Sequence, residues 1–175
     1  MERKATRPAP ARAVPPLTGL VATDGATRQV AETLAAELLA AWGAHDLDRV
    51  LACYAPDFQG LDIGEAAVTQ NFAALRKMTR RWFRAFPDLR LQREGLLVEG
   101  NQVALSWTAT ATHLGAFLRI PATGRPVRIR GISMLTVDAG RIVRGSRIWD
   151  MAAFLRDVGL LPELRADNGD ETGDT

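Results

Sequence analysis

Two arginines stand in stretches that are otherwise rich in apolar residues, Arg130 in VRIRGISML and Arg147 in RIVRGSRIW. A charged group inside a protein needs a partner, because an unpaired buried charge is costly. These guanidinium groups could pair with acids that follow the first strand, such as Asp62 or Glu65, or hold an anionic ligand in a fork of two hydrogen bonds. We expect both arginines to face a cavity. The alternative is that one or both emerge at its mouth and are solvated.

Two further residues could act as acid, base or hydrogen-bonding groups. His113 follows a strand-like run in the segment THLG, where its ring could either take part in chemistry or bond the backbone of a turn. Asp150 stands between a strand and a helix-like segment. An aspartate there commonly caps the following helix, and this role competes with a catalytic or substrate-orienting one.

Large side chains near these groups could form the wall of a pocket for an aromatic ligand. The candidates are Phe72, Trp82, Phe86, Trp107, Met134 and Trp149, and Tyr54 would add a hydroxyl group. The alternative is that they are ordinary core residues. Cys53 is interpreted as a small buried apolar residue.

The chemistry-bearing residues depend on a predicted sheet between Val103 and Asp150. β-Branched and apolar residues alternate there with polar ones, and the loop IPATGRP and the turn VDAGR divide the stretch into three antiparallel strands. A further strand before Glu99 forms a hairpin with the first of them, and a short strand is expected over 58–63. Neither face of the last two strands is cleanly polar, which indicates a sheet curled around a pocket.

Helices are predicted before and after this sheet. Val30, Leu34, Leu38 and Ala41 recur at helical spacing, and a second short helix carries Leu47, Val50, Leu51 and Tyr54, with Asp46 as its N-cap and Pro56 as its end. A third helix carries Phe72, Leu75, Trp82 and Phe86, and a short one follows Asp150. The order of helices, strand meander and terminal helix is typical of an α+β domain rather than of βαβ units.

Composition limits the classes of function. The chain of 175 residues suits one domain, which we place at 26–165, and its formal charge of +2 gives no argument for nucleic acid. A single cysteine excludes an internal disulfide, and two histidines without metal-ligand spacing argue against a protein metal site.

The two ends of the chain are predicted to be disordered. Residues 1–25 are rich in Pro, Ala and Arg, and residues 166–175 are acidic and polar. The chain has no apolar run of signal-peptide or membrane-spanning length. We therefore expect a cytoplasmic protein that does not bind membranes.

Four separated segments resemble the SnoaL-like polyketide cyclase family: AWGAHDLDRVLACYAPDF, FPDLR, WTATATHLGAFLRIPATGRPV and GRIVRGSRIWD. The resemblance covers roughly 31–161. It implies the cone-shaped fold of nuclear transport factor 2, in which a curved antiparallel sheet, about three N-terminal helices and a short C-terminal helix enclose a deep apolar cavity.

The resemblance also implies a chemistry. Cyclases of this family close the last ring of anthracycline-type polyketides by an intramolecular aldol reaction that uses neither metal nor cofactor. An Asp on the last strand acts as acid and base, and a His on the preceding strand supports it. In this chain those positions fall on Arg147 and Ile132, and a position usually held by Gln falls on Arg130.

The implied function is cofactor-independent cyclisation, or a related enolisation, of a polyketide-derived polycyclic molecule. Asp150 is the acid–base candidate, Arg130 and Arg147 would anchor an oxyanion or carboxylate, and His113 would support them. Tyr54, Asp62, Trp82, Trp107, Ile132, Met134 and Trp149 are the remaining expected substrate-binding residues. The alternatives are the family's hydroxylase branch and a non-catalytic binding protein. A homodimer formed through the outer sheet face is also expected.

Overall fold

The computed structural model describes residues 25–64 and 71–162. The predicted tails, except for Gly25, and Glu65 lie outside this part of the chain. Helix α1 spans Gly25–Gly43 and α2 spans Leu47–Ala52; strand β1 covers Tyr54–Asp62, and α3 covers Phe72–Ala85. The strands β2 (Arg90–Glu99), β3 (Gln102–Thr112), β4 (Pro126–Asp138) and β5 (Arg141–Trp149) follow, and α4 (Met151–Asp157) comes last.

The predicted α+β architecture is confirmed, with one correction to the sheet. The strand order is β1-β5-β4-β3-β2, and the pairs formed by β2 to β5 are antiparallel, whereas β1 runs parallel to β5. The sheet is therefore mixed. The pairing of β1 with β5 joins segments that are far apart in the chain. The alternation of apolar and polar residues within one strand does not show which strand lies beside it, so the sequence did not predict this pair.

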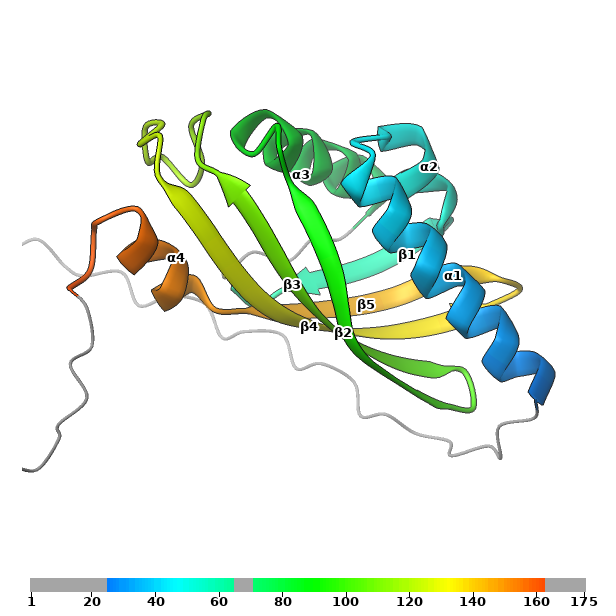
Figure 1. The fold of residues 1–175 in the computed structure, drawn as a ribbon. Helices are drawn as coiled ribbons and strands as arrows, with labels where there is room; N and C mark the ends of the chain where they lie inside the picture. The colour runs from blue at the N-terminus through cyan, green and yellow to red at the C-terminus, as the bar shows by residue number, and fades with distance from the viewer. Residues whose placement is uncertain (1–24, 65–70, 163–175) are drawn as a thin grey trace, which may run out of the picture.

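The helices α1, α2 and α3 lie on one side of the curved sheet, and α4 follows the end of β5 (Figure 1). Three of the helices begin at a capping residue. The side chains of Asp46, Asn71 and Asp150 accept backbone hydrogen bonds at the N-termini of α2, α3 and α4. The predicted cap at Asp46 is thus confirmed.

Two expectations about the N-terminal region are wrong. Val30 is 45% exposed, because the buried stripe of α1 runs through Ala31, Ala35 and Leu38. Tyr54 and Pro56 belong to β1 rather than to the end of α2. Proline is tolerated in β1 because this strand is at the edge of the sheet.

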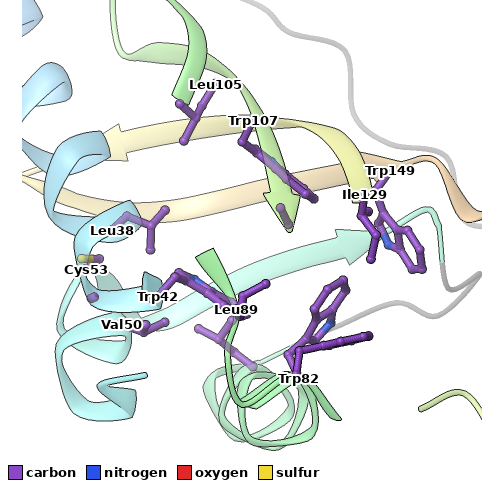
Figure 2. Packing of buried hydrophobic residues seen from close by; sticks show 14 of the residues in the cluster. Leu38, Trp42, Val50, Cys53, Trp82, Leu89, Leu105, Trp107, Ile129 and Trp149 are labelled. Carbon is purple, nitrogen blue, oxygen red and sulfur yellow. The ribbon is translucent and has the colours of Figure 1, made fainter. Parts of the chain in front are cut away.

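The core lies between the inner face of the sheet and the helices, and aromatic side chains fill much of it. Trp42, Trp82 and Trp107 project into this space from α1, α3 and β3 (Figure 2). Trp82 makes edge-on ring contacts with Trp42, Phe117 and Trp149, at centroid distances of 4.8–6.3 Å. Such contacts stabilise the core beyond the area that they bury.

The sheet register separates the residues of β4 into two faces. Ser133 stands directly opposite Arg147, and Gly131 stands opposite Trp149, so these residues share the inner face. Arg130 is three residues from Ser133 and lies on the outer face. The expectation that both Arg130 and Arg147 face the cavity is therefore wrong for Arg130.

Gly131 provides the space in which the Trp107 ring lies across β4. A Cβ atom at position 131 would stand 2.3 Å from the ring atom Cζ2 of Trp107, which no real contact allows. The ring is buried in the core, so it has little room to move.

We predict that Gly131→Ala lowers the free energy of unfolding by about 1–3 kcal/mol, the usual cost of overpacking a core. Urea denaturation followed by circular dichroism measures the change. Gly43→Ala is the matched control, because nothing lies within 4 Å of its added Cβ atom. Equal stability of the two variants would contradict the assigned role of Gly131.

Candidate functional site

A cavity opens between the inner face of the sheet and the helices α1 and α3. The cavity is partly open, and the empty space of about 790 Å³ in and around it includes open solvent. Most of the residues around it are apolar, which favours a largely apolar ligand. Five of the predicted site residues are among those that line it: Tyr54, Asp62, Trp82, Trp107 and Arg147.

An ion pair between a buried carboxylate and a partly buried guanidinium lies at one side of this cavity. The parallel register places Asp62 of β1 directly beside Arg147 of β5. The Nε and Nη2 atoms of Arg147 both donate to Oδ2 of Asp62, and the Nε contact measures 3.1 Å. The indole Nε1 of Trp149 donates to Oδ1 at 3.1 Å. Asp62 is 4% exposed, so these donors replace the water that its carboxylate would otherwise bind.

Further contacts hold the Arg147 guanidinium. Its carbon lies 5.3 Å from the centroid of the Trp82 ring, and its Nη2 lies 3.4 Å from Sδ of Met78. Within the described part of the chain, the side-chain bonds of Arg147 use Nε and Nη2, so Nη1 keeps its hydrogens for another acceptor. The predicted pairing of Arg147 with Asp62 is therefore present, and one end of the guanidinium can still bind a ligand.

Tyr54 adds a neutral donor to the same cavity. Burial raises the pKa of its hydroxyl group to about 12, an effect that the positive charge of Arg147 partly offsets. The phenol therefore keeps its proton at neutral pH. No residue in the described ranges forms a hydrogen bond with this hydroxyl, so it can donate to a ligand.

Sequence reasoning missed several residues that line the cavity, including Leu38 and Trp42 of α1 and Ser133 of β4. The helical spacing of Leu38 showed that it was buried but not what it covered. The alternation of side chains along β4 could have identified Ser133, because it places Ser133 on the same side of the strand as Ile129.

His113 is fully buried outside the cavity lining. Its ring lies 5.6 Å from the centroids of both Phe86 and Phe154, and its Nδ1 is 3.1 Å from Oγ1 of Thr123. Its backbone also bonds Arg125 and Gly124 across the loop. His113 is thus a buried loop residue whose ring packs on aromatic side chains and bonds a neighbouring side chain. Burial lowers the pKa of its ring, with a partial offset from a backbone hydrogen bond at Gly115.

Asp150 is exposed, and its Oδ1 accepts from the backbone N–H of Ala153 at 2.8 Å. Asp150 therefore caps α4.

A groove on the outer face of the sheet is lined by residues that include Arg130, Ile132, Met134, Trp149 and Asp150. The expectation that Arg130, Ile132 and Met134 meet the ligand in the inner cavity is wrong, because the pleat turns them to the opposite face. Homodimerisation through this face stays a prediction.

We predict that Arg147→Met lowers the free energy of unfolding by about 3–5 kcal/mol, because it leaves the Asp62 carboxylate buried without its cation. The double variant Asp62→Asn/Arg147→Met should be more stable than Arg147→Met, since it removes both charges. A double-mutant cycle by urea denaturation measures the coupling. Strictly additive losses would contradict a buried ion pair.

The buried ring of His113 should make stability depend on pH. Because burial lowers its pKa below 6.5, the unfolded chain binds the proton more readily than the folded protein does. The neutral His113 ring therefore contributes to the free energy of unfolding above about pH 6.5, and this contribution is lost as the pH falls through the folded-state pKa. The free energy of unfolding changes by at most about 1.4 kcal/mol per pH unit from this group.

We expect His113→Phe to flatten the pH dependence of unfolding between about pH 7 and 5. His45→Asn is the control, because His45 is the only other histidine and asparagine tolerates its positive φ of 55°. Urea titrations at several pH values give the slopes. If the free energy of unfolding of His113→Phe changed with pH as steeply as that of the wild type, the pH dependence would come from other groups.

Comparisons with known proteins place this geometry in a family. The sequence profile described as SnoaL-like polyketide cyclase matches residues 32–158. A comparison with curated proteins found no match. In the described part of the chain, no helix is long and apolar enough to cross a membrane, and no group of three His, Cys, Asp or Glu residues could hold a metal ion.

Several solved structures are similar along most of their length. AclR from Streptomyces galilaeus, provisionally described as a hydroxylase, is 30% identical; the match covers 77% of this chain and 88% of AclR, with a TM-score of 0.70. TsrD from Streptomyces laurentii is 27% identical over 79% of this chain and 99% of its own, with a TM-score of 0.69.

IdmH from Streptomyces antibioticus, provisionally described as a polyketide cyclase, is 26% identical over 74% of this chain and 98% of its own, with a TM-score of 0.66. A protein from Catenulispora acidiphila with a ketosteroid isomerase-like fold is 14% identical over 73% of this chain and 93% of its own, with a TM-score of 0.63, and it shows a likeness of fold alone. Because the family profile spans more than two thirds of the sequence, the chain belongs to the SnoaL-like polyketide cyclase family.

Proposed function

We propose that this protein binds a polyketide-derived aromatic molecule in the inner cavity and catalyses its enolisation and ring closure without a cofactor. The observation that carries the proposal is the ion pair between the buried Asp62 and the partly buried Arg147 within a largely apolar cavity. Such an arrangement combines a carboxylate with a fixed cation in a site of low polarity, where electrostatic effects on a reaction are strong.

Asp62 takes the place of Asp150 as the proposed acid–base residue. Among the described residues that line the cavity, Asp62 is the only carboxylate. It would remove a proton from the carbon between two carbonyl groups, and the electron pair of that C–H bond would pass to a carbonyl oxygen as an enolate. Nη1 of Arg147 and the Tyr54 hydroxyl are the donors proposed to stabilise this oxygen.

Ring closure would follow from the enolate. Its carbon attacks a second carbonyl carbon of the same molecule, a C–C bond forms, and the oxygen of that carbonyl takes the proton back from Asp62. Reactants and product therefore have the same mass. Trp42, Trp82 and Trp107 would hold the aromatic part of the substrate near these groups.

A hydroxylase is the second candidate, and the 30% identity to AclR favours it. A binding protein without catalytic activity is the third. The three candidates differ in the mass of what is recovered after incubation, so one experiment distinguishes them.

We predict that the purified protein converts an anthraquinone β-keto ester into a product of unchanged mass and altered retention, with no cofactor added. Asp62→Asn should lower kcat by about 10²–10⁴-fold, as expected for loss of a general base. Tyr54→Phe should lower kcat/KM by about 10-fold or more, since it removes one oxyanion donor. Liquid chromatography with mass detection gives both rates.

Asp150→Asn is the matched control, because asparagine is an equally good helix cap and Asp150 lies on the outer face. Its turnover should equal that of the wild type. A product heavier by one oxygen atom would favour the hydroxylase, and ligand binding without turnover would favour the binding protein. Full activity of Asp62→Asn would remove Asp62 from the mechanism.

A further inference from the structure

Ser133 has a hydroxyl group whose hydrogen bonding is set by a neighbouring indole. Nε1 of Trp107 lies 3.1 Å from Oγ of Ser133. An indole N–H can only donate, so the serine oxygen must be the acceptor in this pair. The serine proton is left for another partner, and no residue in the described part of the chain accepts it.

The position of Ser133 brings this proton close to the ion pair. Ser133 lines the inner cavity and stands directly across the β4–β5 pair from Arg147. Opposite residues of an antiparallel pair have Cβ atoms about 5 Å apart on the same face. The free proton of Ser133 and the free Nη1 of Arg147 therefore belong to neighbouring side chains in the cavity.

Trp107 cannot easily turn away from Ser133. Its ring lies against Gly131, with no space between them for a Cβ atom, and the side chain is 5% exposed. The indole thus holds its N–H toward Ser133, and Trp107 acts as a positioning residue for the hydroxyl group.

We propose that Ser133 is a specificity-determining hydrogen-bond donor that binds, together with Arg147, an anionic or strongly accepting oxygen of the ligand. The proposal rests on the proposed function in that it requires a small molecule in this cavity. Tyr54 adds a further donor to these two, whereas both oxygens of the Asp62 carboxylate already accept hydrogen bonds. The ligand class it selects carries a phenolate, an enolate or a β-dicarbonyl oxygen.

The test uses 2-hydroxyanthraquinone, whose visible absorption changes when its phenol ionises. Donors around the bound oxygen favour the phenolate, so the dye should ionise at a lower pH when bound to the wild-type protein than in water. Ser133→Ala should raise the pKa of the bound dye by about one unit and weaken binding of its anion about tenfold, as for the loss of one hydrogen bond to a charged group.

Three further variants make the result specific. Ser133→Thr keeps the hydroxyl group, so the pKa of the bound dye should stay close to its wild-type value. Trp107→Phe frees the Ser133 hydroxyl to turn, so it should raise the pKa of the bound dye by part of the amount that Ser133→Ala does. Ser106→Ala is the matched control, since Ser106 lies on the outer face and bonds the backbone of Gly95. Circular dichroism shows that each variant is folded.

An unchanged dye pKa in folded Ser133→Ala would overturn the role of Ser133 and leave the proposed function standing. Equal effects of Ser133→Ala and Ser106→Ala would also overturn it. Failure of the wild-type protein to bind the dye would overturn both the ligand class and the proposed use of the cavity. The dye is not turned over, so loss of catalysis alone cannot produce any of these results.

Discussion

The buried pair of Asp62 and Arg147 is the interaction on which the arrangement of the site depends. A carboxylate that is 4% exposed is stable only if donors surround it, and here the donors are Arg147 and Trp149 of the neighbouring strand. Both partners come from strands far apart in the chain. The pair therefore exists only when β1 has joined β5 in the correct parallel register.

The packing around this pair has two consequences. Trp82 covers the guanidinium of Arg147 and also contacts the rings of Trp149 and Phe117, so the polar cluster and the aromatic core share a residue. The absence of a side chain at Gly131 lets the Trp107 ring lie close against β4, where its Nε1 reaches Ser133. The same close packing that stabilises the fold thus orients the polar groups in the cavity.

The two faces of the sheet serve different purposes. The inner face carries the apolar cavity with its few polar groups. The outer face carries Arg130, Ile132 and Asp150, of which Asp150 caps the terminal helix. β4 carries apolar residues on both faces, Ile129 and Leu135 on the inner one and Ile132 and Met134 on the outer one, so its alternation does not show which face meets the helices. This explains why outer residues were expected in the cavity.

Local sequence patterns were enough to predict the α+β class, the antiparallel strands from β2 to β5, the helix cap at Asp46, and the alternation that groups Arg147 with Trp149. For Asp150 they left a helix cap and a catalytic role both open, and the structure shows the cap. These features follow from local spacing and from side chains that act within a few residues of their own position. The pairing of β1 with β5, the side of β4 that meets the helices, and the burial of His113 among phenylalanines were decided by the tertiary structure. Each of them depends on contacts between segments distant in the chain, and the free energy of such contacts is not encoded in the periodicity of any one segment.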